Sequence, residues 1–231
     1  MNKKTQQIAR FGLLTALALV LGLMDRAIPV SALLGGFVPG IKLGLANTVL
    51  LYAVYLMDRR SSILLMLTKV LLSGFLFGSL TAILYSLSGG VLSLAVMLLI
   101  RKKPAHGALA TAFLALAADV YLLIGTPNPA GQRLLIIILI GLAFLAATAV
   151  YILIQKSKIS GVMGTSLAGA VAHNAGQVLM ACFVLHSPRL LTTYLPVLVG
   201  IGAAVGCLTG VVTERVLKAL KINSEFRTQN S

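Results

Sequence analysis

Residues 61–100 form a run of forty residues with a single charged side chain, Lys69. A membrane-spanning helix needs about 20 mostly apolar residues. The run is too long for one span, so it predicts two helices that fold back on each other, with a turn either near residues 78–79 or near residues 88–90. Only 10% of the chain is charged and 58% is hydrophobic, which excludes a soluble domain and predicts an integral membrane protein.

The remaining apolar runs, separated by charged or turn-forming residues, extend this pattern to the whole chain. They predict an all-α, polytopic helical bundle with eight spans, a single membrane domain and both termini in the cytoplasm. The expected spans are residues 8–24, 41–57, two within 61–100, 107–125, 134–154, 160–185 and 193–213.

The charge of the chain, +14 from 19 Lys and Arg against five Asp and Glu, supports this orientation. With eight crossings and a cytoplasmic N-terminus, 14 of the 19 basic residues lie on the cytoplasmic side, as the positive-inside rule requires. Most of the charge is therefore interpreted as orientation and attraction to anionic membrane lipid, and nucleic-acid binding is not expected. The other basic residues are Lys69, within a span, and Arg26, Lys42, Arg133 and Arg189.

The acidic residues are too dispersed for the usual metal-dependent chemistry. Binding of magnesium and diphosphate needs clustered carboxylates, and the chain also lacks the motifs of ATPases, zinc proteases and serine hydrolases. Cys182 and Cys207 lie in apolar runs and are expected to be free thiols. We expect a chain that is not itself an enzyme and that holds no metal and no cofactor. The five acidic residues are Asp25, Asp58, Asp119, Glu214 and Glu225.

Polar side chains inside apolar runs are costly in a membrane, so they are the first candidates for a binding site. His173 and Gln177 are four residues apart on one helical face, and Asn174 is rotated from them by about 100°. Both a ligand site and hydrogen bonding between helices are open for these three side chains. A metal site is disfavoured because no second histidine or carboxylate follows at ligand spacing.

Lys69 lies too deep in its span for its ammonium to reach the membrane surface with ease. It either pairs with Asp119 or faces a cavity that takes an anionic ligand, and Asp119 either pairs with Lys69 or handles a proton. Lys42 alone would be an interfacial anchor, but with Lys69 and Arg26 it could line one cavity that opens outward. Asn47 follows Lys42 by five residues, so their joint action would need a bent helix.

Small residues four positions apart mark helix faces that pack closely. Intramolecular packing is the stronger interpretation for each such pair or row, including Gly202, Gly206 and Gly210 in the last span and Gly12 with Ala16 in the first. For Gly12 and Ala16 in the first span, docking to a separate membrane protein is the alternative to packing within the chain.

Residues 40–47 (GIKLGLAN), 168–177 (AGAVAHNAGQ) and 194–198 (YLPVL) resemble the bacterial membrane family called Gx transporters, also labelled heptaprenyl diphosphate synthase component I. The resemblance covers about residues 8–103 and 158–220. It implies a relative of the substrate-binding S-components of energy-coupling factor (ECF) vitamin transporters in the bacterial cell membrane, with six helices and an outward-opening pocket. By position, the implied pocket residues are Lys42, Asn47, Lys69, His173, Asn174 and Gln177.

Relative to that family, residues 104–157 are expected to be an inserted hairpin of two helices. The resemblance implies a membrane-embedded component that binds or transports a small, anionic molecule, such as a vitamin-like compound or an isoprenoid diphosphate. A separate ECF-type ATPase module would then hydrolyse ATP. The alternative is a non-catalytic membrane subunit of heptaprenyl diphosphate synthase, in isoprenoid and menaquinone biosynthesis, that works with a catalytic prenyl synthase subunit. The transport hypothesis predicts that Lys42, Lys69 and His173 meet in one cavity.

Overall fold

The computed structural model describes residues 3–28, 44–77, 80–125, 130–156, 161–187 and 189–219, and within these ranges all regular secondary structure is helical. The predicted all-α class is therefore confirmed. The eight helices of the described ranges are α1 (Lys3–Ala27), α3 (Asn47–Leu56), α4 (Arg59–Phe77), α5 (Leu80–Ile100), α6 (Pro104–Gly125), α7 (Ala130–Lys156), α8 (Val162–Val184) and α9 (Arg189–Ala219).

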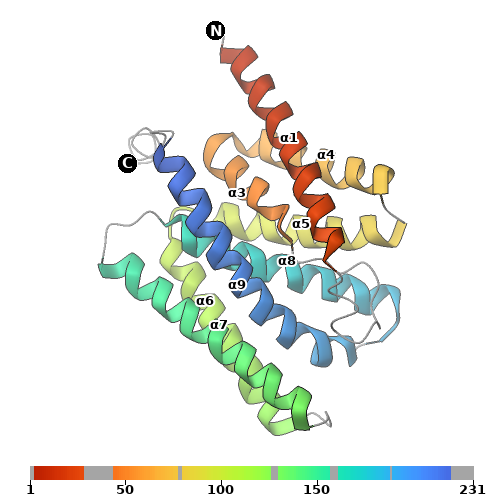
Figure 1. The fold of residues 1–231 in the computed structure, drawn as a ribbon, viewed down its shortest axis with the longest axis vertical. Coiled ribbons are helices and arrows are strands. Elements are labelled where there is room, and N and C mark those ends of the chain that lie inside the picture. Colours follow the sequence, from red (N-terminus) through yellow and green to blue (C-terminus); the bar gives the residue numbers. More distant parts are fainter. Residues whose placement is uncertain are drawn as a thin grey trace.

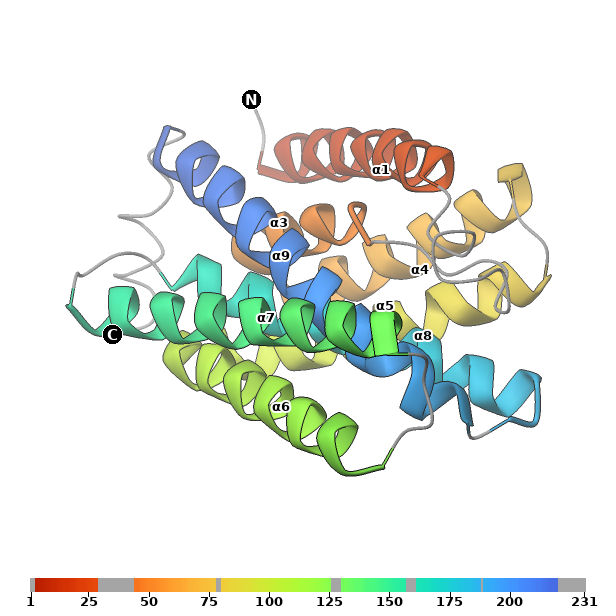
Figure 2. The same cartoon turned by 60° about the horizontal axis from the view of Figure 1, so that its bottom comes forward.

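Helix α8 is central in the bundle, packed against α5 and against α9 (Figure 1). Helices α1, α3 and α4 lie together on one side, and α6 and α7 pair on the opposite side, as two views show (Figures 1 and 2). A side chain Cβ at Gly206 of α9 would lie 2.8 Å from the Cα of Leu167 in α8, so only glycine allows this approach. Gly202 and Gly210 also face α8. The predicted intramolecular packing of this face is confirmed.

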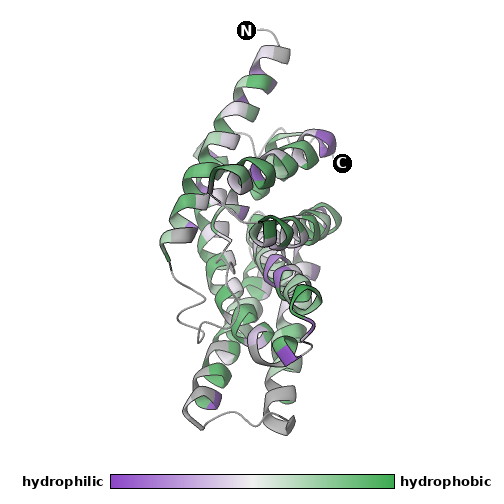
Figure 3. Cartoon of the chain, turned by 90° about the vertical axis from the view of Figure 1, so that its right-hand side faces the viewer, coloured by the Kyte–Doolittle hydropathy of each residue, from purple (hydrophilic) through white to green (hydrophobic). Residues whose placement is uncertain are grey.

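Five of the described helices, α1, α5, α7, α8 and α9, contain segments long and apolar enough to cross a membrane. Figure 3 shows hydrophobic residues along the length of the helices, with hydrophilic residues at the C-terminal end of α9. The chain is therefore a multi-pass membrane protein. The expected total of eight crossings and the cytoplasmic position of both termini stay predictions.

Helix α4 shows how polarity is distributed between the inside and the outside of the bundle. Its inner face holds Leu65, Met66 and Lys69, and the lysine is only 8% exposed. On its outer face, Leu64 is 56% exposed and Phe75 is 81% exposed. A helix in water would expose its lysine and would not expose leucine and phenylalanine to this extent, so the arrangement fits an outer face that contacts lipid and a polar role for Lys69 inside.

The hairpin expected within residues 61–100 is confirmed. Helix α4 ends at Phe77 and α5 begins at Leu80, and residues 88–90 lie inside α5, so a turn near residues 88–90 is wrong. The two glycines there are packing positions instead. A Cβ at Gly89 would lie 2.8 Å from the carbonyl oxygen of His173 in α8.

The span expected at residues 41–57 is shorter in the structure. Helix α3 has ten residues, a length of about 15 Å, which is half the thickness of the hydrocarbon core. It starts at Asn47 because Gly44 has a left-handed backbone (φ +85°) and its carbonyl accepts the N–H of Asn47 at 2.8 Å in a turn. Lys42 lies outside the described residues. A continuous helix through Lys42 and Asn47, as expected from 41–57, is therefore wrong.

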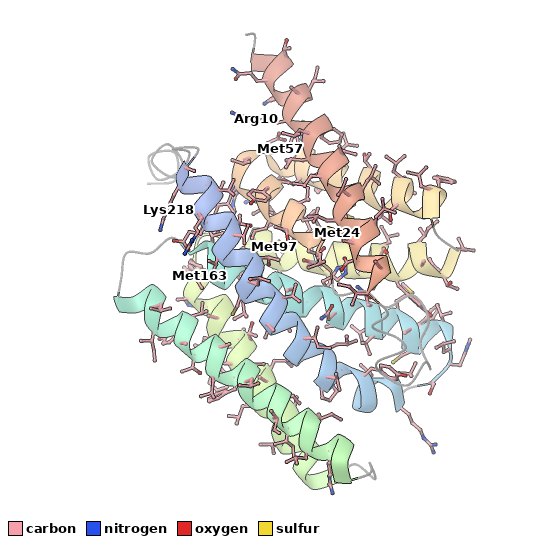
Figure 4. All side chains as sticks on the ribbon, in the orientation of Figure 1. Arg10, Met24, Met57, Met97, Met163 and Lys218 are labelled. Atoms are coloured by element: carbon pink, nitrogen blue, oxygen red, sulfur yellow. The ribbon has the colours of Figure 1, made fainter. Side chains whose placement is uncertain are left out.

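Helices α6 and α7 form the pair expected for residues 104–157 and pack against α8 and α9. Buried alanines on both helices, among them Ala112 and Ala143, allow this close contact. In the centre of the bundle, Met97 of α5 fills the space that a side chain at Gly169 of α8 would need (Figure 4). Cys182 is a half-buried free thiol, and Cys207 is another, as predicted.

Gly12 and Ala16 lie on an exposed face of α1. Among the residues that the structure places, no atom lies within 4 Å of a Cβ built at Gly12. The pair therefore does not serve packing within the described chain, and docking to another membrane protein stays a prediction.

Candidate functional site

A small cavity lies where α1, α4, α5 and α8 meet the turn before α3. Its volume is about 20 Å³, room for one or two water molecules. Glycine, alanine and valine residues of α1, α4 and the turn complete its walls. The polar residues that line it are Asp25 of α1, Lys69 and Ser73 of α4, Ser86 of α5 and His173 of α8.

Lys69 and Asn47 form the first polar contact of the cavity. The Lys69 ammonium donates a hydrogen bond to Asn47 Oδ1 at 3.3 Å. Asn47 is the first residue of α3 and is 4% exposed, and its Nδ2 has no hydrogen-bond partner among the described residues. The positive end of the α3 dipole lies at the same place. An ammonium, an amide N–H and a helix N-terminus together favour an acidic group, and the carboxylate of Asp25, which accepts the Ala46 N–H, lies at this helix end.

The His173 ring lies between two glycines from different elements. A Cβ at Gly44 would lie 3.0 Å from His173 Cδ2, and a Cβ at Gly89 would lie 2.8 Å from His173 Cε1. Gln177 Nε2 is the hydrogen-bond partner of His173 Nε2. The predicted shared face of His173 and Gln177 is confirmed.

Close contact between α5 and α8 fixes the backbone that carries His173. The hydroxyl of Ser88 donates a hydrogen bond to the carbonyl oxygen of Gly176 at 2.7 Å. A Cβ at Gly176 would lie 2.8 Å from the carbonyl oxygen of Ser88, so the two backbones touch. The glycines of the 168–177 stretch thus position the imidazole at the cavity.

Asp25 is the charged residue of the lining that was not predicted from the sequence, because a charge at the end of an apolar run marks the end of a span; Ser73 and Ser86 were not predicted either. In the structure Asp25 is 2% exposed, and its Oδ2 accepts the backbone N–H of Ala46 at 3.4 Å. The sequence contains a pattern that indicates the position of Asp25 on the inner face of α1. Ala18, Gly22 and Asp25 are spaced i, i+4, i+7, which places them on one face of α1, and all three line the cavity.

The structure does not bring all six candidate pocket residues together. Asn174 points away toward α9, where its Nδ2 donates to the carbonyl oxygen of Leu198 at 2.7 Å. Of the three residues expected to meet, Lys69 and His173 line the cavity, and Lys42 is not among the described residues. The side chain of Asp119 in α6 is likewise outside them, so its pairing with Lys69 and its handling of a proton stay predictions.

A second polar cluster lies at the opposite, C-terminal end of α3. Arg101 donates to the carbonyl oxygen of Val54 at 3.2 Å, which satisfies a helix-end carbonyl with a cation. The hydroxyls of Tyr55 and Thr165 are 3.0 Å apart and join α3 to α8. Throughout the described ranges, no three or more His, Cys, Asp or Glu side chains are grouped so that they could hold a metal ion.

The chain matches the family model described as heptaprenyl diphosphate synthase component I. The match covers residues 14–126 and 128–216, nearly all of the described helices. No curated protein and no solved structure matches the chain. The match includes most of α6 and α7, so the insertion of residues 104–157 relative to S-components stays a prediction. The resemblance seen in the three sequence stretches is confirmed, and the chain belongs to the heptaprenyl diphosphate synthase component I family.

Proposed function

We propose that this chain is a membrane-embedded component that binds and transports a small polar molecule, and that the cavity between α1, α4, α5 and α8 is its ligand site. One observation carries the proposal. Lys69 and His173, from helices far apart in the sequence, line the same buried cavity, and each is hydrogen-bonded to a further polar side chain, Asn47 or Gln177.

The polarity of this site is difficult to explain by stability alone. Apolar residues of similar volume often stabilise a protein as well as a buried ion pair does, and in a membrane the cost of burying charge is higher still. Lys69 and Asp25 are both nearly inaccessible, on helices whose outer faces are apolar. Charged groups retained in such a place favour a ligand-binding role.

The cavity as it stands is too small for a vitamin-sized ligand. Pockets for vitamin-sized ligands measure about 300–1,000 Å³, and this cavity holds only one or two water molecules. A ligand therefore requires α1 or α4 to move away from α8. The proposal predicts that ligand binding changes the spacing between α1 and α8.

Native mass spectrometry of the detergent-solubilised chain tests the proposal. We expect a small molecule to be retained by the wild-type chain and to be lost from Lys69→Ala and from His173→Ala. Matched controls are Lys102→Ala and His106→Ala, because both side chains are exposed and far from the cavity lining. Full retention by the Lys69 and His173 variants, or equal loss from the controls, would contradict the site.

The family description supports a second candidate, an accessory membrane subunit of heptaprenyl diphosphate synthase. The five acidic residues of the chain are dispersed, so in this role it would hold the lipid product or recruit a catalytic subunit. Prenyl-chain synthesis by membranes with and without this chain distinguishes the two candidates. Dependence of synthesis on the chain favours the subunit, and co-purification with an ECF-type ATPase module favours transport. For either role we propose the bacterial cytoplasmic membrane, with both termini inside.

A further inference from the structure

The described part of the cavity wall contains one acidic and one basic side chain. Asp25 comes from α1 and Lys69 from α4, two helices that pack against each other. Both side chains are more than nine-tenths buried. The sequence analysis expected an anionic ligand because it included the lysine without the aspartate.

Each of these two charges already has a partner within the protein. The Asp25 carboxylate accepts the backbone N–H of Ala46, at the end of α3 where the helix dipole favours a negative charge. The Lys69 ammonium donates a hydrogen bond to Asn47 Oδ1 at 3.3 Å. The two charges also attract each other across a cavity with room for one or two water molecules, because the surroundings have a low dielectric constant. Neither charge therefore requires a counter-charge from a ligand.

A balanced pair of charges makes a charged ligand unfavourable. An anion would gain the attraction of Lys69 and meet the repulsion of Asp25, and for a cation the two effects are exchanged. In both cases the ligand would lose its hydration without finding a net opposite charge in the described wall. A diphosphate, with at least two negative charges, is the least suited. An uncharged molecule avoids this cost.

The other polar groups of the described lining are suited to an uncharged molecule. They are the hydroxyls of Ser73 and Ser86 and the ring of His173, whose hydrogen-bond partner is the neutral amide of Gln177. Hydroxyls both donate and accept hydrogen bonds. The Ser73 hydroxyl is directed toward α1, where a Cβ at Gly22 would lie 3.8 Å from its oxygen, so the glycine leaves room beside it. Such groups can recognise a carbonyl, a hydroxyl or a ring nitrogen.

We propose that the cavity takes an uncharged, hydrogen-bonding molecule, such as an amide, a nucleobase or a polyol, and that Asp25 and Lys69 compensate each other's charge. The inference rests on the proposed function. It changes the expected ligand class from small anions to neutral polar molecules, and it makes Asp25 the residue that prevents Lys69 from attracting anions.

Removing one charge of the pair tests this assignment. Asp25→Asn keeps an oxygen that can accept the Ala46 N–H and removes the negative charge, so Lys69 is no longer compensated. The shift of the unfolding midpoint of the full chain in detergent measures the binding of acetate, inorganic phosphate and pyrophosphate. We expect at least one of these anions to bind Asp25→Asn about ten times or more tighter than the wild-type chain.

Two further variants show whether the gain depends on the cavity. Addition of Lys69→Met to Asp25→Asn should abolish the gain, because no cation remains to attract the anion. Asp58→Asn, which removes an exposed carboxylate outside the cavity lining, should not produce it. The molecule that native mass spectrometry finds on the wild-type chain gives an independent measurement, and we expect it to carry no ionised group at neutral pH.

Two results would overturn the inference: a bound molecule with an ionised group, or anion binding that is equally tight in the wild-type chain and in Asp25→Asn. An acidic molecule that is lost from Lys69→Ala would leave the proposed function standing, whereas the absence of any bound molecule would contradict both. If Asp25→Asn does not fold, the molecule retained by the wild-type chain decides. An uncharged molecule supports the inference, and an ionised one refutes it.

Discussion

Two neighbouring glycines of α5 allow the cavity geometry to be tested with a single added methyl group. Gly89 faces the backbone and ring of His173, whereas Gly90 faces the flexible side chain of Met66. Both lie inside the same helix, so Gly89→Ala and Gly90→Ala have the same intrinsic effect on helix formation. Any difference between the two variants measures how tightly His173 is enclosed.

The structure sets the size of this difference. Alanine stabilises a helix interior by about 1 kcal/mol relative to glycine. A Cβ at Gly89 would lie 2.8 Å from three atoms of His173, one of them a backbone oxygen that cannot rotate away, and overpacking of this kind costs about 3 kcal/mol. A Cβ at Gly90 would lie 3.2 Å from Met66, which can change rotamer at a cost of about 0.5 kcal/mol. We therefore expect Gly89→Ala to lose about 2 kcal/mol and Gly90→Ala to gain about 0.5 kcal/mol.

Thermal unfolding in detergent micelles measures the effect. The chain has no tryptophan, so far-ultraviolet circular dichroism is the suitable signal. A difference of about 2.5 kcal/mol corresponds to about 5–10 °C between the midpoints of the two variants. Retention of the bound molecule should also fall in Gly89→Ala only, because its methyl group displaces the His173 ring. Equal midpoints, or a more stable Gly89→Ala, would refute the placement of His173 against α5.

Three further predictions concern the surroundings of the site. Asn174→Ala should lower stability by about 1–2 kcal/mol, because the hydrogen bond to Leu198 is lost, while ligand retention in native mass spectra stays unchanged. Gly206→Ala should lower the unfolding midpoint, because its Cβ would meet α8 backbone at 2.8 Å. Hydrogen bonds from the hydroxyl and the N–H of Ser61 lower the pKa of Asp58, which caps α4. Its contribution is present above its unfolded-state pKa, near 4, and is lost as pH falls through the lowered folded-state pKa. Asp58→Ala should therefore cost about 1 kcal/mol at neutral pH and flatten the stability curve in acid, as measured by unfolding at a series of pH values.

The helices that could be predicted well are those whose length is set by the membrane. The spans expected at residues 107–125 and 160–185 agree with α6 and α8 within three residues at each end. The hairpin within residues 61–100 followed from its length alone. In these segments a long apolar run has only one low-energy conformation, since every backbone N–H and C=O must be satisfied within the helix.

Helix α3 could not be predicted in this way, because its length is set by its neighbours. Hydropathy does not register the left-handed backbone of Gly44, which lies three residues before the start of α3 at Asn47. The residues of the site show the same difference between positions set within one helix and positions set by neighbouring elements. The shared face of His173 and Gln177 is a local property of α8 and was predictable, whereas the direction of Asp25 depends on the turn before α3.

A half-length helix inside a membrane protein leaves unsatisfied backbone groups at both ends, away from water. In α3 both ends meet a charge of the sign that the helix dipole favours, Asp25 at the first turn and Arg101 at the last. Charges in such positions contribute roughly 0.3–2 kcal/mol each. Asp25 thus belongs both to the cavity and to the support of α3. Arg101 and the hydrogen bond between Tyr55 and Thr165 hold the other end of α3, so the two ends of this short helix are fixed by contacts to different parts of the bundle.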